Sequence, residues 1–87
     1  MEKELVPLGA LGAGEIGVIE ELRGGHGFVS RLSSLGFTPG ARIEVVQNYG
    51  HGPLIVAIRD SQIALGRGQA MKVYVSTPEG GKGERRA

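Results

Sequence analysis

The sequence predicts a mainly β protein: a small barrel of about five short strands with one short α-helix inserted after the first strand. Two observations indicate this fold class. Between residues 35 and 65, short runs of alternating apolar and polar residues end at Gly and Pro turns, a pattern typical of strands with tight connections. Glycine is frequent, with 16 in the 87-residue chain, and most of these residues separate apolar segments, where turns often require positive φ. We expect the sheet to close on itself, because closure removes exposed strand edges.

The N-terminal part predicts a capping turn and the first strand. Leu5, Leu8 and Leu11 recur at intervals of three, which favours a short amphipathic turn over one end of the barrel. Residues 16–22 predict the first strand, and the glycine-rich segment 24–27 ends it.

A helix is predicted over residues 27–35. Its apolar positions share one helical face and are Phe28, Val29, Leu32 and Leu35. Gly36 follows where many helices end in a left-handed glycine. Pro39 and Gly40 then suit the two central positions of a type II turn.

Four further strands complete the predicted sheet, at residues 42–48, 54–59, 62–65 and 71–75. Asp60 and Ser61 would form a two-residue hairpin connection, and residues 66–70 a single tight turn. The predicted domain spans residues 1–75. Residues 76–87 are rich in Gly, Glu, Lys and Arg, so we expect a disordered polar tail.

Composition argues against several classes of protein. The net charge is only +1, which disfavours a strong electrostatic surface for nucleic acid or an anionic membrane. The N-terminus does not resemble a signal peptide, and no apolar stretch is long enough to insert into a bilayer. Cysteine is absent, which fits the reducing cytoplasm, where we expect the protein to reside.

Motifs that could carry chemistry are weak. The segment from Gly12 to Gly17 matches the pattern G-x-G-x-x-G, but a dinucleotide site requires a preceding strand and a following helix, and here a strand follows. We interpret these residues as turn glycines. The serines have no evident His-Asp partner to activate them. The sequence therefore predicts a binding protein without enzymatic activity.

Two histidines, His26 and His51, lie in separate glycine-flanked loops. Metal sites generally need three or four ligands, and no carboxylate has suitable spacing from either histidine. We expect solvated histidines, no cofactor and no metal site within one chain. A transition-metal site shared between chains stays an alternative.

The best candidate for recognition is the loop at residues 48–53, because Tyr49 has the amphipathic, rigid side chain that is enriched at binding hot spots. An apolar patch could join this loop to the helix. The candidate partner-binding residues are Phe28, Leu32, Tyr49, His51 and Pro53. In the alternative interpretation, Phe28 and Leu32 belong to the core and Tyr49 only covers it.

Four segments resemble the FeoA family in sequence and order: Gly-Glu-Ile-Gly-Val-Ile at 14–19, Arg-Leu-Ser-Ser-Leu-Gly-Phe-Thr-Pro-Gly at 31–40, Ile-Glu-Val-Val at 43–46, and Gly-Pro-Leu-Ile-Val at 52–56 with Ile-Ala-Leu-Gly-Arg at 63–67. The resemblance covers about residues 8–75 and implies an SH3-like barrel. The same domain resembles the C-terminal domain of iron regulators of the diphtheria-toxin-repressor family. Ser33 and Ser34 stand where family members often carry basic residues.

The resemblance implies a non-enzymatic, cytosolic accessory protein of ferrous-iron uptake. Its partner would be the cytosolic part of the GTP-binding ferrous-iron transporter, a FeoB-like membrane protein. The alternative is a metal-responsive iron regulatory protein that acts on another partner. A nucleic-acid-binding barrel is disfavoured, because the chain has four aromatic residues and no basic stripe. Self-association into a homo-oligomer stays open.

Overall fold

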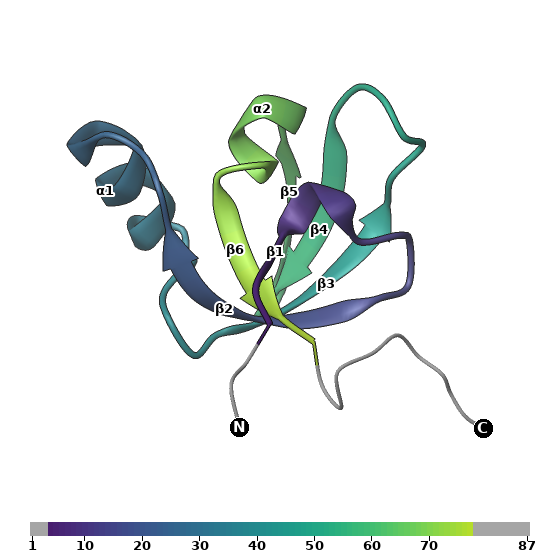
Figure 1. Ribbon diagram of the computed structural model, residues 1–87, viewed down its shortest axis with the longest axis horizontal. Coiled ribbons are helices and arrows are strands. Elements are labelled where there is room, and N and C mark those ends of the chain that lie inside the picture. Colours follow the sequence, from purple (N-terminus) through teal and green to yellow (C-terminus); the bar gives the residue numbers. More distant parts are fainter. Residues whose placement is uncertain (1–3, 78–87) are drawn as a thin grey trace.

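The computed structural model describes residues 4–77 and shows one antiparallel six-stranded sheet with the order β1-β6-β2-β3-β4-β5 (Figure 1). The elements are β1 (Val6–Pro7), the 3₁₀ helix η1 (Leu8–Ala10), β2 (Ile16–Leu22), α1 (His26–Ser34), β3 (Arg42–Gln47), β4 (Leu54–Ile58), β5 (Ser61–Leu65), α2 (Arg67–Ala70) and β6 (Val73–Ser76). The predicted fold class is confirmed, with the helix inserted after β2. None of the described helices is long and apolar enough to cross a membrane.

The core lies on the concave side of the bent sheet. Its strands contribute alternate residues, as the side-chain period of two requires. The buried hydrophobic residues are Leu8, Leu11, Ile19, Leu32, Phe37, Ile43, Val45, Leu54, Val56, Ile58, Leu65, Ala70, Val73 and Val75. Leu8 and Leu11, at η1 and just after it, confirm the predicted capping turn.

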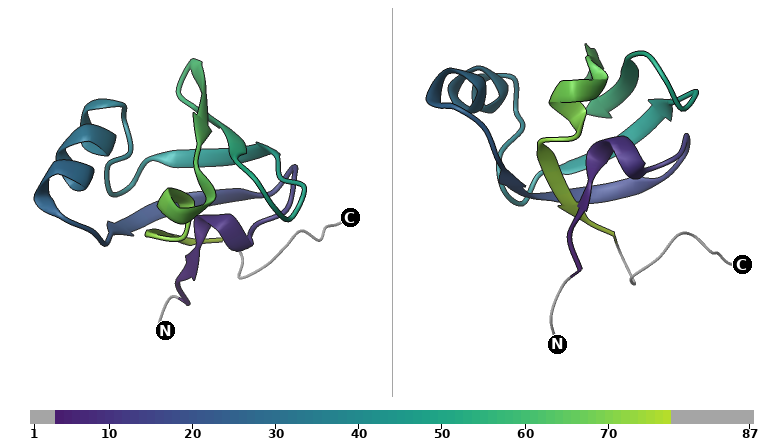
Figure 2. Two further views of the ribbon diagram at one scale, coloured as in Figure 1. Left: turned by 90° about the horizontal axis from the view of Figure 1, so that it is seen from above. Right: turned by 45° about the horizontal axis from the view of Figure 1, so that its top comes forward.

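The expected closure of the sheet is wrong. Among the described residues, β1 pairs only with β6 and β5 only with β4, so both strands remain edges. Between these edges, η1 contacts both α2 and β6 and covers the opening of the barrel (Figures 1 and 2). The helices η1 and α2 each contribute a buried apolar side chain to the core, Leu8 and Ala70.

Several element boundaries differ from the prediction. The sheet has a sixth strand, β1, which is too short for a periodic pattern and contains Pro7. The hairpin connection is Arg59 and Asp60, because Ile58 pairs with Ser61. Arg59 adopts a φ of 56°, a conformation that no local glycine signals.

The C-terminal ends of the predicted and observed strands also differ. The last strand, β6, begins at Val73 and not at residue 71. Ser76, assigned above to the tail, is part of β6, and its hydroxyl donates a hydrogen bond to a Glu20 carboxylate oxygen at 2.6 Å. Thr77 follows without regular structure, and residues 78–87 of the predicted tail lie outside the described residues.

Helix α1 ends as its sequence predicts. Gly36 has a φ of 105°, and its N–H donates to the Ser33 carbonyl at 3.0 Å. The Phe37 N–H donates to the Leu32 carbonyl at 3.0 Å, which completes a Schellman motif around two buried side chains. Leu35 was expected on the buried stripe but is 46% exposed, because α1 ends before it.

The predicted Pro-Gly turn follows directly. The Ala41 N–H donates to the Thr38 carbonyl at 2.9 Å, and Gly40, at the second central position, has a φ of 92°. This turn leads into β3, where Ile43 and Val45 are buried in the core.

Candidate partner-binding loop

The predicted binding residues fall into two groups at opposite ends of the molecule. Tyr49, His51 and Pro53 are exposed in the loop between β3 and β4, whereas Phe28 and Leu32 belong to α1. Three views place α1 and this loop far apart, on either side of the sheet's centre (Figures 1 and 2). The five residues therefore do not form one continuous apolar patch.

The two α1 residues are structural in this arrangement. Leu32 is 1% exposed and is part of the core. Phe28 is half-buried, and its ring packs so closely on Gly24 that a Cβ added there would lie 2.5 Å from the ring atom Cδ2. The Lys72 ammonium lies 5.3 Å from the centroid of the Phe28 ring, at cation–π distance.

Tyr49 stands at the other end with 71% of its surface exposed, the highest value among the exposed large hydrophobic residues. A β-bulge between Val45 and Gln47 shifts the register of β3 against β4 just before the loop. Gly50 and Gly52 both have positive φ, which lets the backbone turn tightly after Tyr49.

Asn48 holds the loop to the N-terminal segment. Its amide Nδ2 donates to the carbonyl oxygens of Leu11 at 2.7 Å and Gly9 at 3.2 Å. Its Oδ1 accepts from the Gly50 N–H at 2.9 Å. One side chain thus satisfies the backbone N–H that follows Tyr49 and two carbonyl groups of a distant segment.

Arg67, at the start of α2, completes this network. Its Nη2 donates to Asn48 Oδ1 at 2.6 Å, its Nε to the Gly52 carbonyl at 3.1 Å, and its Nη1 to the Gly9 carbonyl at 3.5 Å. A guanidinium group can donate in several directions from one rigid plane. Arg67 therefore ties the loop to α2 while it supports Asn48.

These hydrogen bonds hold the backbone of the loop that carries Tyr49. Hydrogen bonds that fix a loop reduce the entropy lost on binding. The arrangement is suited to recognition of another surface, and it brings no nucleophile and base together.

The two histidines are separated in the same way as the binding residues. His26 begins α1 and His51 lies in the loop. Within residues 4–77, no group of three or more His, Asp or Glu side chains is placed to hold a metal ion. Neither histidine therefore belongs to a group of three such ligands within this part of the chain.

The G-x-G-x-x-G segment is a turn that runs into β2, with its last glycine, Gly17, inside the strand. Its first glycine and Glu15 bond to each other twice: the Gly12 N–H donates to Glu15 Oε1 at 2.6 Å, and the Glu15 N–H donates to the Gly12 carbonyl at 3.1 Å. Gly14 has a φ of 91°, and strand β2 follows. No helix begins here to receive a phosphate.

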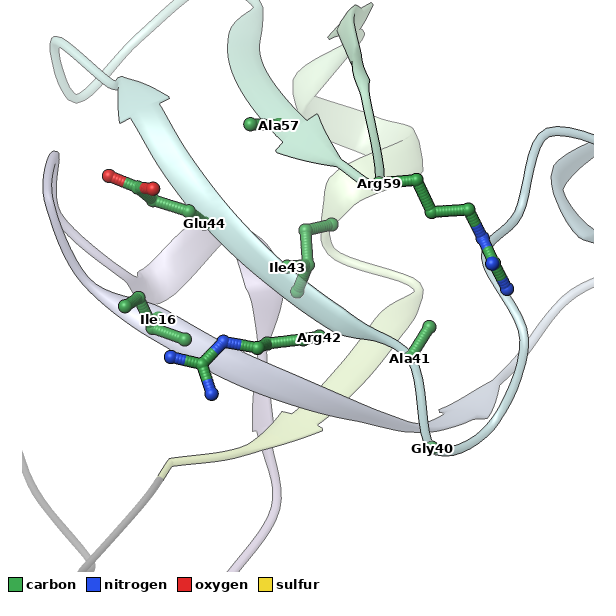
Figure 3. A pocket seen from close by; sticks show the side chains of 8 residues that line it. All are labelled: Ile16, Gly40, Ala41, Arg42, Ile43, Glu44, Ala57 and Arg59. Carbon is green, nitrogen blue, oxygen red and sulfur yellow. The ribbon is translucent and has the colours of Figure 1, made fainter.

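A shallow pocket of about 540 Å³ lies on the outer face of β2, β3 and β4 (Figure 3). Its lining residues are Ile16, Gly40, Ala41, Arg42, Ile43, Glu44, Ala57 and Arg59. Arg42 and Glu44 give it charges of both signs. The Arg59 side chain extends toward the turn after α1, where it lies against Gly36. The pocket contains no catalytic constellation.

Comparisons with known proteins identify the family. The family model described as the FeoA domain matches residues 6–77. The chain belongs to the FeoA family. It is 37% identical over 82 residues to a putative Fe(2+) transport protein A of Methanocaldococcus jannaschii, and the alignment covers 93% of this chain and 99% of that one. The family consists of accessory proteins of Fe(2+) transport.

Solved structures of FeoA proteins share the fold. The crystal structure of an iron uptake regulatory protein (FeoA) matches with a TM-score of 0.79 at 37% identity, covering 84% of this chain and 97% of that one. The Stenotrophomonas maltophilia FeoA complexed with zinc, described as a prokaryotic SH3 domain protein, matches with a TM-score of 0.70 at 26% identity, covering 82% and 89%. The SH3-like fold is thereby confirmed.

The predicted relation to metal-dependent repressors is confirmed at the level of the fold. A manganese-dependent transcriptional repressor matches with a TM-score of 0.79 at 20% identity, and the match covers 88% of this chain and 44% of the repressor.

Asn48 and Arg67 are the site residues that sequence reasoning missed. An Asn two residues before a glycine is a known turn signal, because its side chain can bond the backbone two residues on. That signal could have identified the bond from Asn48 to Gly50. Nothing local connects Asn48 with Arg67, which lies 19 residues away.

Proposed function

We propose that the chain is a non-enzymatic cytoplasmic accessory protein of ferrous-iron uptake that docks on the cytosolic part of a GTP-binding, FeoB-like ferrous-iron transporter. The observation that carries this proposal is the preorganised loop with Tyr49 at 71% exposure. Membership in the FeoA family supports the iron-transport role.

Docking would use the loop end of the molecule. Tyr49, His51 and Pro53 offer one aromatic side chain, one imidazole and one rigid ring on a single exposed loop. Aromatic side chains near the centre of an interface commonly provide much of the binding energy. The half-buried Phe28 and the buried Leu32 are not part of this surface.

Docking would affect transport only if the chain binds one state of the transporter more tightly than another. Nucleotide in the GTP-binding domain is the variable that most directly changes that state. The affinity of the chain for the transporter should therefore depend on the bound guanine nucleotide.

The test is calorimetric titration of the purified chain into the solubilised transporter, with GDP, with a non-hydrolysable GTP analogue and without nucleotide. We expect saturable binding that Tyr49→Ala weakens by about 30-fold or more, which corresponds to the loss of about 2 kcal/mol that defines a hot-spot residue. Leu35→Ala is the matched control, because Leu35 is an exposed apolar residue at the α1 end. Equal affinity for wild type and Tyr49→Ala would remove the loop as the docking surface, and no binding in any nucleotide state would refute the proposed partner.

A further inference from the structure

The two edges of the sheet differ in how well they are protected against pairing with another strand. Edge β1 has only two residues, and one of them, Pro7, has no N–H to donate. Edge β5 has five residues in a regular register with β4, without the bulges that interrupt β2–β6 and β3–β4. It contains neither proline nor a charged residue. Charges, prolines and bulges are the usual protection of an edge strand.

The register of the β4–β5 hairpin determines which backbone groups of β5 face outward. Ile58 and Ser61 flank the two-residue connection, so they form a hydrogen-bonded pair. Such pairs alternate along an antiparallel ladder. The N–H and C=O groups of Gln62 and Ala64 therefore point away from β4, and both residues are exposed.

We propose that β5 pairs with β5 of a second copy of this chain, antiparallel about a two-fold axis, to join two sheets edge to edge. In one register, Gln62 of each copy lies opposite Ala64 of the other, and the outward backbone groups of both residues in both copies are satisfied. Isologous pairing of this kind is self-complementary and closes at two copies.

The side chains of β5 also favour pairing with a second copy of the chain. The same register places the half-buried Ile63 of one copy opposite that of the other, and pairing would bury more of both side chains. Because the strand carries no charge, no like charges face each other within it.

The pairing is independent of the transporter proposal, since β5 and the Tyr49 loop are different surfaces. A five-residue edge buries less than the roughly 1,200–2,000 Å² of a standard interface, so the dimer should be weak. In a series of protein concentrations from about 10 μM to 1 mM, we expect the dimer to be populated only toward the upper end, because an interface this small binds weakly.

The test combines sedimentation velocity of the full chain with the concentration dependence of its backbone amide NMR shifts. Wild type should show a rising sedimentation coefficient, and the largest shifts should occur at Gln62 and Ala64. A wild-type chain that stays monomeric throughout the series would overturn the proposal and would leave the edge for an extended peptide of another protein.

Two double variants test the register. In Gln62→Lys/Ala64→Lys, lysines of the two copies oppose each other, so dimerisation should be lost. In Gln62→Glu/Ala64→Lys, each glutamate faces a lysine of the other copy, so dimerisation should be kept or strengthened. Ser30→Lys/Ser34→Lys adds the same charge on exposed positions of α1 and should behave as wild type. Undiminished dimerisation of the first variant would place the interface elsewhere and contradict the proposal.

Discussion

At one end of the sheet, α1 is attached through buried apolar side chains, whereas at the other end the loop between β3 and β4 is attached through hydrogen bonds. Leu32 and Phe37 place the end of α1 in the core. Asn48 and Arg67 bind the loop to backbone carbonyls of the N-terminal segment and of the loop itself. Both ends carry exposed residues, but apolar packing holds α1 in place whereas side-chain hydrogen bonds hold the loop.

The difference shows how an 87-residue chain with a small core can still present a fixed surface. Large apolar side chains that attach α1 must be buried to stabilise the fold, so they cannot contact a partner. Polar attachment leaves the large side chain of the loop, Tyr49, in solvent while the backbone beneath it is held. This contrast supports the proposal that recognition uses the loop end and not α1.

The largest effect should come from shortening Leu32. Leu32→Ala should lower the free energy of unfolding by about 2–5 kcal/mol, because it removes a fully buried side chain and leaves a cavity. Urea denaturation with an unchanged m-value would measure the loss. Leu35→Ala is the control on the same segment and should change stability by less than about 0.5 kcal/mol, since the side chain is largely in solvent. Equal losses for the two variants would contradict the apolar attachment of α1.

The second-largest loss of stability should come from removing the hydrogen bonds of Asn48. Asn48→Ala should lower the free energy of unfolding by about 1–3 kcal/mol, because the carbonyls of Gly9 and Leu11 lose a part-buried donor. The amide of Gly50 should also exchange its hydrogen faster, since its acceptor is removed. Denaturation and native-state hydrogen exchange measure the two results.

Asn48→Asp separates the two halves of the network. The carboxylate still accepts from the Gly50 N–H and from Arg67, but it cannot donate to the two carbonyls. Stability should fall while the protection of the Gly50 amide persists. Loss of that protection in the Asp variant, or wild-type stability in the Ala variant, would show that Asn48 does not hold the loop.

Local signals explain why much of the fold could be predicted from the sequence. The strand at 16–22 coincides with β2, and the strands predicted at 42–48 and 54–59 correspond to β3 and β4, in which buried and more exposed residues alternate. The helix end at Gly36 and the Pro-Gly turn could be predicted, because helix ends and turns depend on the backbone preferences of single residues.

Features set by distant parts of the chain were not predictable in this way. No local pattern shows that β5 stays an edge, since that depends on which strands meet across the whole sheet. The candidate site was predicted in part. The exposed loop with Tyr49 was expected, but its separation from α1 and the bond between Asn48 and Arg67 arise from tertiary structure.

The smallest predicted change in stability concerns the turn that connects α1 to the sheet. Gly36→Ala should lower the free energy of unfolding by about 1–2 kcal/mol, because an L-residue is strained in the left-handed region. The added Cβ would also lie 3.3 Å from Arg59 Nε, a side-chain atom that must shift slightly. Gly68→Ala in α2 is the matched control: no positive φ is required there, nothing lies within 4 Å of the added Cβ, and alanine favours the helix by about 0.5–1 kcal/mol. Thermal or urea unfolding should therefore show opposite signs for the two substitutions, and the same sign in both would mean that the conformation of Gly36 does not secure the end of α1.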